Sequence, residues 1–247
     1  MVDALDTLVT DFYVNQKLAL KMDLPESRET VLDLFGRLKK EFPGLANFRR
    51  FEDELALESD ELQRAYSWFS LKGTTLRSGS VNPDDLGDAY ELHRKVLEVA
   101  PWFLSISPID IEHLELVFGF DLEAQGDRDA IVFRALMADG PLGEMIRDDE
   151  QVIESQPVLG IALEPTSRMQ AFVEVKTRTT TRERNSGIFT REPISVFLTV
   201  RNTGGIEDLG DLDTRFAALA GCAERLAEER VLPNIVTPLR HAILAEP

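Results

Sequence analysis

Two stretches of this chain match each other, and this internal repeat limits the possible folds more than any other feature does. Residues 54–81 align without a gap over residues 160–187. A second match places Asp85–Asp88 over Asp208–Asp211. Matched blocks that recur in the same order predict a duplicated supersecondary unit. The alternative interpretation is that two segments of similar composition match by accident.

The two matches differ in offset, so the predicted second copy is longer than the first. Leu57 lies over Leu163 and Asp85 over Asp208, which leaves 17 more residues between the blocks in the second copy. The inserted stretch alternates apolar and other residues, which is typical of a strand. We therefore expect an extra strand near residues 188–202, at an edge of the sheet, with these apolar positions: Ile194, Val196, Leu198 and Val200.

The periodicity of apolar residues predicts the same order of elements in both halves, namely a strand, a helix, further strands and a helix. In the first half we expect strands over 12–23, 51–57 and 65–76 and helices over 28–42 and 86–103. In the second half we expect strands over 113–121, 158–163 and 169–184 and helices over 127–138 and from 209 onward, with a short helix from Thr237. Short connections between strands favour an α+β fold, with one antiparallel sheet and helices packed on one face. The repeats would span residues 1–107 and 108–247, either as two units or as one continuous domain.

Two resemblances accompany this order of elements. The arrangement resembles the saddle of the TATA-box-binding protein and its relatives, in which two copies of an α+β unit share a curved sheet. Shorter motifs resemble a sporadically distributed bacterial family of unknown function: Glu41-Phe42-Pro43 at a helix end, Val81-Asn82-Pro83 before a helix with Tyr90, and the segment 231–237. The first resemblance implies a fold, and the second supplies no catalytic residue.

The composition excludes several classes of protein. The net charge of −17 opposes binding to nucleic acid. No apolar run is long enough to cross a membrane, and the acidic start of the chain does not resemble a signal peptide. Cys222 is the only cysteine, so no internal disulfide can form. We therefore expect a cytoplasmic protein without a membrane partner.

The strongest local candidate for a site is a row of basic residues near the end of the second copy. If residues 173–184 form one strand, Lys176, Arg178, Arg182 and Arg184 point to one face, and Arg191 follows closely. Such a row suits a phosphate, a carboxylate or an acidic partner segment. The alternative is a solvent-exposed face whose basic side chains pair with acidic neighbours.

No pattern in the sequence predicts catalysis. The three histidines lack metal-ligand spacing, and no nucleophile or phosphate-binding motif is present. We expect His93 at the edge of an apolar helix face. We therefore assign no catalytic residue, metal or cofactor. The leading hypothesis is a binding protein that engages a protein partner through its sheet face or edge, or that associates with itself as a homodimer. The alternative is a small-molecule binding protein or enzyme that holds an anionic ligand on the basic residues.

Overall fold

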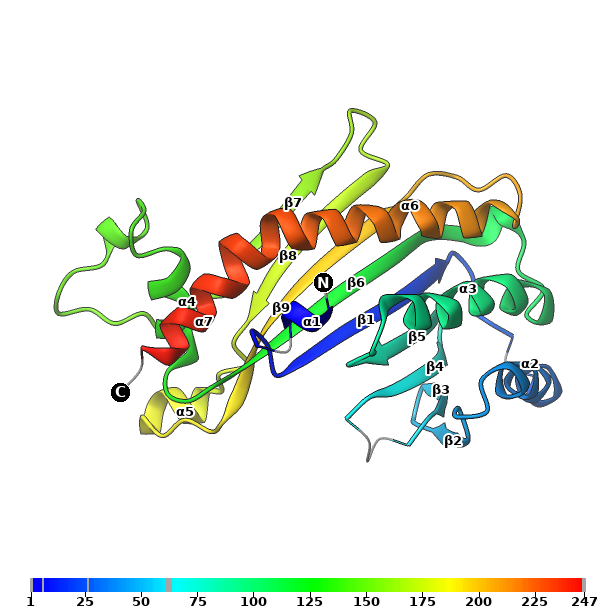
Figure 1. The fold of residues 1–247 in the computed structure, drawn as a ribbon, viewed down its shortest axis with the longest axis horizontal. Coiled ribbons are helices and arrows are strands. Elements are labelled where there is room, and N and C mark those ends of the chain that lie inside the picture. Colours follow the sequence, from blue (N-terminus) through cyan, green and yellow to red (C-terminus); the bar gives the residue numbers. More distant parts are fainter. Residues whose placement is uncertain (1, 6, 26, 61–63, 246–247) are drawn as a thin grey trace.

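The computed structural model describes residues 2–5, 7–25, 27–60 and 64–245 of the chain. Its strands form one nine-stranded antiparallel sheet in the order β2-β3-β4-β5-β1-β6-β9-β8-β7 (Figure 1). The predicted α+β class and the antiparallel sheet are confirmed. The strands are β1 (Asp11–Leu20), β2 (Asn47–Arg50), β3 (Glu54–Glu58), β4 (Tyr66–Lys72), β5 (Thr75–Val81), β6 (Ile111–Ala124), β7 (Val158–Ala162), β8 (Met169–Lys176) and β9 (Glu192–Asn202).

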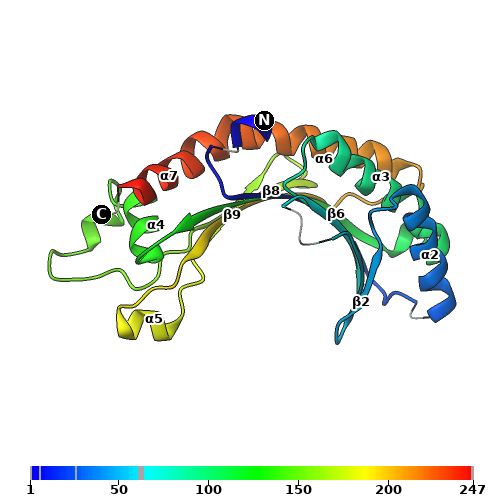
Figure 2. The same cartoon turned by 60° about the horizontal axis from the view of Figure 1, so that its bottom comes forward.

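The sheet is arched, and the longer helices cover its convex side (Figure 2). Of the described helices, only α5 lies beside the concave side, near one end. The helices are α1 (Val2–Leu5), α2 (Arg28–Glu41), α3 (Leu86–Phe103), α4 (Arg128–Leu136), α5 (Thr181–Ser186), α6 (Asp211–Leu226) and α7 (Thr237–Leu244). A π-helical segment, Ala227–Val236, joins α6 to α7 without a break. Among the described residues, no helix is both long enough and apolar enough to cross a bilayer.

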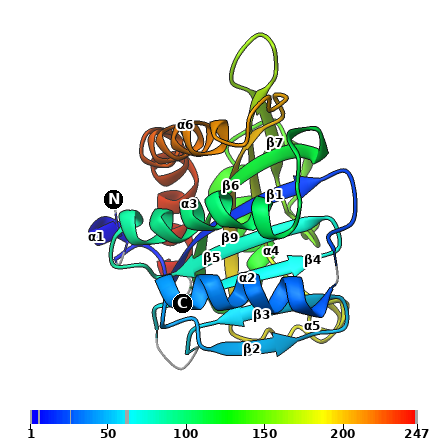
Figure 3. The same cartoon turned by 90° about the vertical axis from the view of Figure 1, so that its right-hand side faces the viewer.

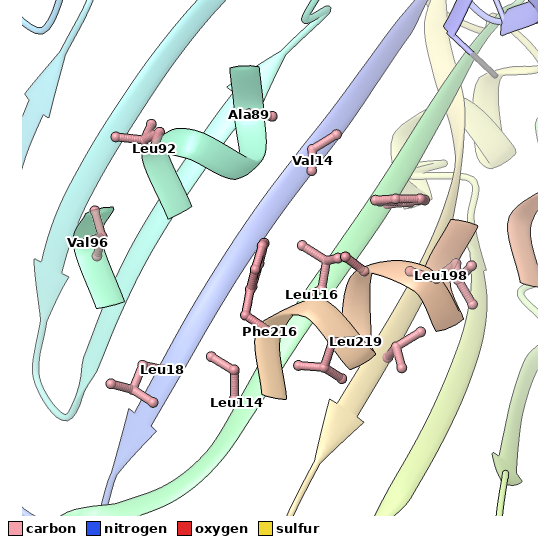
Figure 4. Close-up of a cluster of buried hydrophobic side chains, with 14 of the residues drawn as sticks. Val14, Leu18, Ala89, Leu92, Val96, Leu114, Leu116, Leu198, Phe216 and Leu219 are labelled. Carbon is pink, nitrogen blue, oxygen red and sulfur yellow. The ribbon is translucent and has the colours of Figure 1, made fainter. Parts of the chain in front are cut away.

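The core lies between the convex face of the sheet and the helices. Side chains alternate between the two faces of a strand, so every second residue of β1, β6 and β9 points towards the helices. Val14, Leu116 and Leu198 illustrate this pattern, because they pack beneath Phe216 and Leu219 of α6 (Figure 4). All five side chains are almost completely buried. The alternation in the sequence therefore determines which face becomes the core and which remains open.

The two halves of the chain meet along the middle of the sheet and along one pair of helices. β1 pairs with β6 from Asp11 to Leu20, and α3 packs beside α6 on the convex side (Figure 3). Tyr90 of α3 lies edge-on to Phe216, with ring centroids 5.5 Å apart, and its hydroxyl donates to Glu224 at 2.9 Å. Outward from β1 lie β5, β4, β3 and β2, and outward from β6 lie β9, β8 and β7, so both halves run in reverse chain order and the first half has one more strand. The sheet is therefore continuous across the junction at residues 107–108.

The described first half forms five strands (β1 to β5) and the second half four (β6 to β9), so the prediction of an extra edge strand in the second copy is wrong. β9 lies inside the sheet, between β6 and β8. It lies next to the central strand β6, as β5 lies next to the central strand β1 in the first half. The additional residues lie instead between β8 and β9, where residues 177–191 leave the sheet and form α5. The corresponding connection between β4 and β5 is only Gly73-Thr74. The edges of the sheet are β2 and β7.

Other predicted boundaries also need correction. Residues 65–76 form a hairpin, because Gly73 adopts a positive φ of 54° and reverses the chain between β4 and β5. Ser27 occupies the cap position of α2, but its side chain makes no capping hydrogen bond. The predicted short helix from Thr237 is confirmed as α7, although the π-helical segment before it means that Thr237 does not cap a free helix end. Asp85 and Asp127 do cap α3 and α4, as their sequence positions indicate.

His93 lies deeper than the edge position expected from the sequence. The ring is fully buried, with Nδ1 2.8 Å from Ser78 Oγ and Nε2 3.2 Å from the Val14 carbonyl oxygen. Burial lowers the pKa of His93 to about 3, against the opposing effect of the Val14 carbonyl, so the ring is neutral near neutral pH. Although a serine beside a histidine resembles a nucleophile and its base, both side chains are fully buried. The pair is therefore a structural contact within the core.

Candidate functional site on the concave sheet face

Half-buried aromatic side chains line the concave face, and four of them lie over a glycine of a neighbouring strand. Trp68 of β4 covers Gly79 of β5 so closely that a Cβ atom there would clash with the indole ring. Gly119 lies beneath Tyr13 and Phe197 in the same way, since its Cβ would be 2.8 Å from the tyrosine ring. The glycines therefore let the rings lie close to the sheet. Phe172 covers Gly160 similarly in the second half.

Glu115 is the centre of a charged cluster in the middle of this face. Its carboxylate lies 2.6 Å from Lys17 Nζ and 2.5 Å from the Arg201 guanidinium, and His113 Nε2 lies 3.3 Å away. The cluster comes from β1, β6 and β9, which the register places side by side. The Arg201 guanidinium also lies 5.1 Å from the centroid of the Phe172 ring. The cluster therefore connects the two halves and extends to the aromatic side chains.

The three basic neighbours control the protonation of Glu115. Burial alone would raise the pKa of this carboxyl group, because the charged form loses its water. The His113 ring and the charges of Lys17 and Arg201 outweigh burial and lower the pKa to about 2. Glu115 is therefore an anion at all physiological pH values, and it cannot act as a proton donor near neutral pH.

A second group on this face contains polar atoms without partners. Asn15 Oδ1, Ser70 Oγ and Arg77 Nε are buried from solvent, and within the described part of the chain they have no hydrogen-bond partner. They lie on the adjoining strands β1, β4 and β5, beside Trp68. Buried polar groups in proteins are nearly always hydrogen-bonded. The fold therefore leaves the hydrogen-bonding capacity of these covered atoms unused.

The concave face is close to neutral, although the protein has a net charge of −17. On the strands, the positions that face this side hold almost equal numbers of basic and acidic residues. The basic side chains are Lys17, Arg49, Lys72, Arg77, Lys176 and Arg201, and the acidic ones are Asp11, Glu54, Glu58, Glu115, Asp121, Glu123 and Glu174. Most of the negative charge therefore lies elsewhere on the protein.

The basic residues that the sequence singled out do not form one row. β8 ends at Lys176, which lies 3.2 Å from Glu174 on the concave face. Arg178 has a positive φ of 54° in the loop that follows, and Arg182 is exposed on α5. Arg184 lies 3.6 Å from Asp129, and Arg191 forms an ion pair with Glu123. The predicted strand over 169–184 is therefore wrong beyond residue 176, and the predicted row of basic side chains is dispersed.

The chain leaves the sheet after Lys176 because Thr180 and Glu183 form a capping box that begins α5. The Thr180 hydroxyl accepts from the Glu183 backbone N–H, and the Glu183 carboxylate accepts from the Thr180 backbone N–H at 2.8 Å. A threonine followed three residues later by a glutamate is a sequence signal for a helix start. This signal was present in the sequence and outweighed the apparent alternation of residues 173–184.

Arg128 anchors the loop of residues 177–191, and sequence reasoning missed it. Its guanidinium is fully buried and donates to the carbonyl oxygens of Thr177 and Thr190 at 2.7 Å and to Glu183 at 3.0 Å. The adjacent Asp129 accepts from the Thr177 hydroxyl at 2.9 Å. Two consecutive residues at the start of α4 therefore fix α5 in place beside the end of the sheet.

Comparisons with known proteins do not identify the chain. No model of a protein family matches it, and no curated protein resembles it at a significant level. The described residues contain no group of three or more His, Cys, Asp or Glu side chains arranged to hold a metal ion. The functional argument therefore depends on the concave face itself.

Proposed function

We propose that this protein binds a protein partner on the concave face of its sheet. The observation that carries the proposal is the combination of half-buried aromatic rings and charged side chains around Trp68, Arg77 and Arg201. Aromatic side chains and arginine are the residues that contribute most to protein–protein interfaces. A near-neutral face inside a strongly acidic protein suits a partner surface that carries charges of both signs. It does not suit nucleic acid, which requires an excess of positive charge.

Site-specific photo-crosslinking tests this proposal. We expect a crosslinking amino acid at Trp68 or Phe172 to capture one partner protein in source cells. The same amino acid at Ala218, which is exposed on the convex side in α6, is the matched control and should capture none. The double variant Arg77→Ala/Arg201→Ala should weaken binding of the purified partner by about tenfold or more. Equal crosslinking from Ala218, or unchanged affinity of the double variant, would refute the concave face as the binding surface.

We also propose self-association through the edge strand β7. Val158–Ala162 contains no charged residue, and the exposed fractions of Val158 and Leu159 are 65% and 59%. Among the described residues β7 pairs only with β8, so its other edge presents backbone groups without a strand partner. The opposite edge strand, β2, contains Arg49 and Arg50, which discourage pairing with another chain. Antiparallel pairing of two copies of β7 around Gly160 would satisfy the symmetry of a homodimer.

A charged substitution at the β7 edge tests self-association. We expect the wild-type chain to show the mass of a dimer in sedimentation equilibrium at high concentration. Leu159→Lys should give a monomer, because the desolvation of its charge opposes pairing. Ile188→Lys is the control, since Ile188 is also apolar and exposed but lies outside the sheet edge. If the wild type is monomeric, or if both variants behave alike, β7 is not the interface.

We interpret the two halves as copies of one ancestral unit. The support is the common element order outward from β1 and β6 and the pair of short turns in which Asp85 accepts from Gly87 N–H and Asp208 accepts from Gly210 N–H. On this interpretation β9 corresponds to β5, the ungapped sequence match is wrong where it places residues 75–81 over 181–187, and the loop of residues 177–191 is the addition that distinguishes the second copy.

A further inference from the structure

A groove lies between the second half of α3 and the residues that begin α6. The two helices run beside each other on the convex side of the sheet, so this groove faces away from the proposed partner surface (Figure 3). Its volume is about 620 Å³, which is within the usual range of ligand sites. We call this space the α3–α6 groove.

Trp102 lines the α3–α6 groove and has its indole ring largely in solvent. Its exposed fraction is 76%, and Ile109, which follows the lining residue Pro108, is 77% exposed. Leu97 and Leu209 add apolar surface to the lining. Tryptophan is among the side chains that contribute most to binding at protein interfaces. The groove therefore combines an exposed aromatic ring with an apolar surface.

The charged part of the lining is predominantly acidic. The carboxylates that line the groove are Glu98, Glu207, Asp208 and Asp213. Among the described residues that do so, Arg94 is the only cation, and four carboxylates against one guanidinium give a net charge of −3. Arg94 already has partners, since it lies 3.5 Å from Asp213 and 5.9 Å from the centroid of the Phe216 ring. Unlike the concave face, the groove therefore carries charge mainly of one sign.

The end of α3 adds to this negative potential. The carbonyl end of a helix carries a partial negative charge, which a lysine or arginine in the last turn complements in many proteins. The last turn of α3 contains no basic residue, and Glu98 lies one turn before Trp102 on the same helix face. The opposite partial charge, at the start of α6, is already complemented by Asp211 and Asp213. The helix ends therefore leave the groove favourable to a cation.

The carboxylates of the groove are accessible to an incoming group. Glu98 lies 2.9 Å from Lys95, but its side chain is 65% exposed, and that of Asp213 is 63% exposed. Exposed ion pairs of this kind contribute about 0–1 kcal/mol, so an incoming cation can replace them. Glu207 is exposed, and within the described part of the chain it has no hydrogen bond or ion pair. A bound cation therefore has carboxylates to pair with at little cost.

We propose that the α3–α6 groove binds an arginine-containing segment of a protein partner. The guanidinium group stacks on the Trp102 ring and donates hydrogen bonds to Glu98 and Glu207, and an apolar neighbour in the segment covers Leu209. A lysine offers the same charge, but its compact ammonium group neither stacks on a ring nor binds a carboxylate through two parallel hydrogen bonds. The negative charge of the groove repels nucleic acid and anionic membranes. This site does not depend on the partner surface proposed for the concave face.

The test uses the full-length protein and a synthetic peptide with blocked ends, in which three arginines alternate with two leucines. Because the chain has two tryptophans, Trp68→Phe leaves Trp102 as the only indole, and its fluorescence should change on titration with the peptide. In calorimetry, the analogue with lysine in place of arginine should bind at least about threefold more weakly. Trp102→Ala should weaken binding of the arginine peptide by about fivefold or more and remove the preference over the lysine peptide. Glu98→Gln/Glu207→Gln should weaken the binding of both peptides.

Asp148→Asn/Asp149→Asn is the matched control, because it removes the same charge from two exposed residues that do not line the groove. This variant should bind the arginine peptide as tightly as the wild type, and circular dichroism would verify that all variants fold. The proposal is overturned if the fluorescence of Trp102 does not change, if the lysine peptide binds equally well, or if the two double variants have the same effect. The last result would show that only the overall charge attracts the peptide. A wild-type chain that self-associates and becomes monomeric in Trp102→Ala would also overturn the proposal, because the occupant would then be a second copy.

Discussion

Replacing Arg128 with methionine is expected to lower the free energy of unfolding by about 3–5 kcal/mol, because the change leaves a buried carboxylate without its cation. The carbonyl oxygens of Thr177 and Thr190 lose the guanidinium donor, and the Glu183 carboxylate loses its positive partner. Methionine fills much of the space but cannot donate a hydrogen bond. Urea unfolding at neutral pH, followed by circular dichroism, measures the change.

Arg182→Met is the matched control for this prediction. Arg182 lies on α5, within the segment that Arg128 anchors, but its side chain is exposed. We expect this substitution to change stability by no more than about 0.5 kcal/mol. In hydrogen exchange, Arg128→Met should also speed the exchange of the Thr190 amide, which donates to Glu183. Equal stabilities of the two variants would show that the buried guanidinium contributes little to the fold.

The second large effect is expected for Glu115→Gln at the centre of the concave face. The substitution removes the anion that Lys17 and Arg201 share, so two cations remain close together without compensation. A fall in the pKa of Glu115 from 4.5 to about 2 on folding corresponds to roughly 3 kcal/mol of stability at neutral pH. Urea unfolding at pH 7 should show a loss of about this size.

The stability difference between the wild type and Glu115→Gln should depend on pH, because folding lowers the pKa of Glu115. The unfolded chain takes up a proton at Glu115 near its ordinary pKa of 4.5, whereas the folded protein does so only near pH 2. The stabilisation is therefore complete above about pH 4.5 and decreases as the pH falls towards 2. The difference between wild type and Glu115→Gln should decrease over this window. Glu112→Gln, an exposed neighbour on the same strand, should show little difference at any pH. If the difference in unfolding free energy between the wild type and Glu115→Gln stays constant from pH 7 to 3, the assigned pKa is contradicted.

The elements of the core were predictable because their signals are local. The alternation in β6 and β9 and the apolar stripe of α6 depend only on residues close in the chain. The order of strands was not predictable in the same way. β9 alternates as an edge strand also would, and only its pairing with β6 and β8 shows that it lies inside the sheet. Periodicity therefore identifies a strand without identifying its neighbours.

The candidate sites were mostly beyond sequence reasoning because their residues are distant in the chain. Arg128 contacts residues 49 to 62 positions away, and Glu115 meets Arg201 across 86 positions. Only the register brings Trp68 over Gly79. The exception is α5, for which Thr180 and Glu183 gave a local signal. Charge alternation alone was a weaker guide than the capping pair.

The continuous pairing of β1 with β6 makes the junction between the halves a natural place to divide the chain. A cut within Pro108–Asp110 would separate the two central strands and uncover a long row of backbone donors and acceptors on each fragment. It would also uncover the rings of Tyr90 and Phe216 on the two helices that meet there. Each fragment would then expose the surface that fits the other, so the two pieces have the properties of a split protein that reassembles by strand complementation.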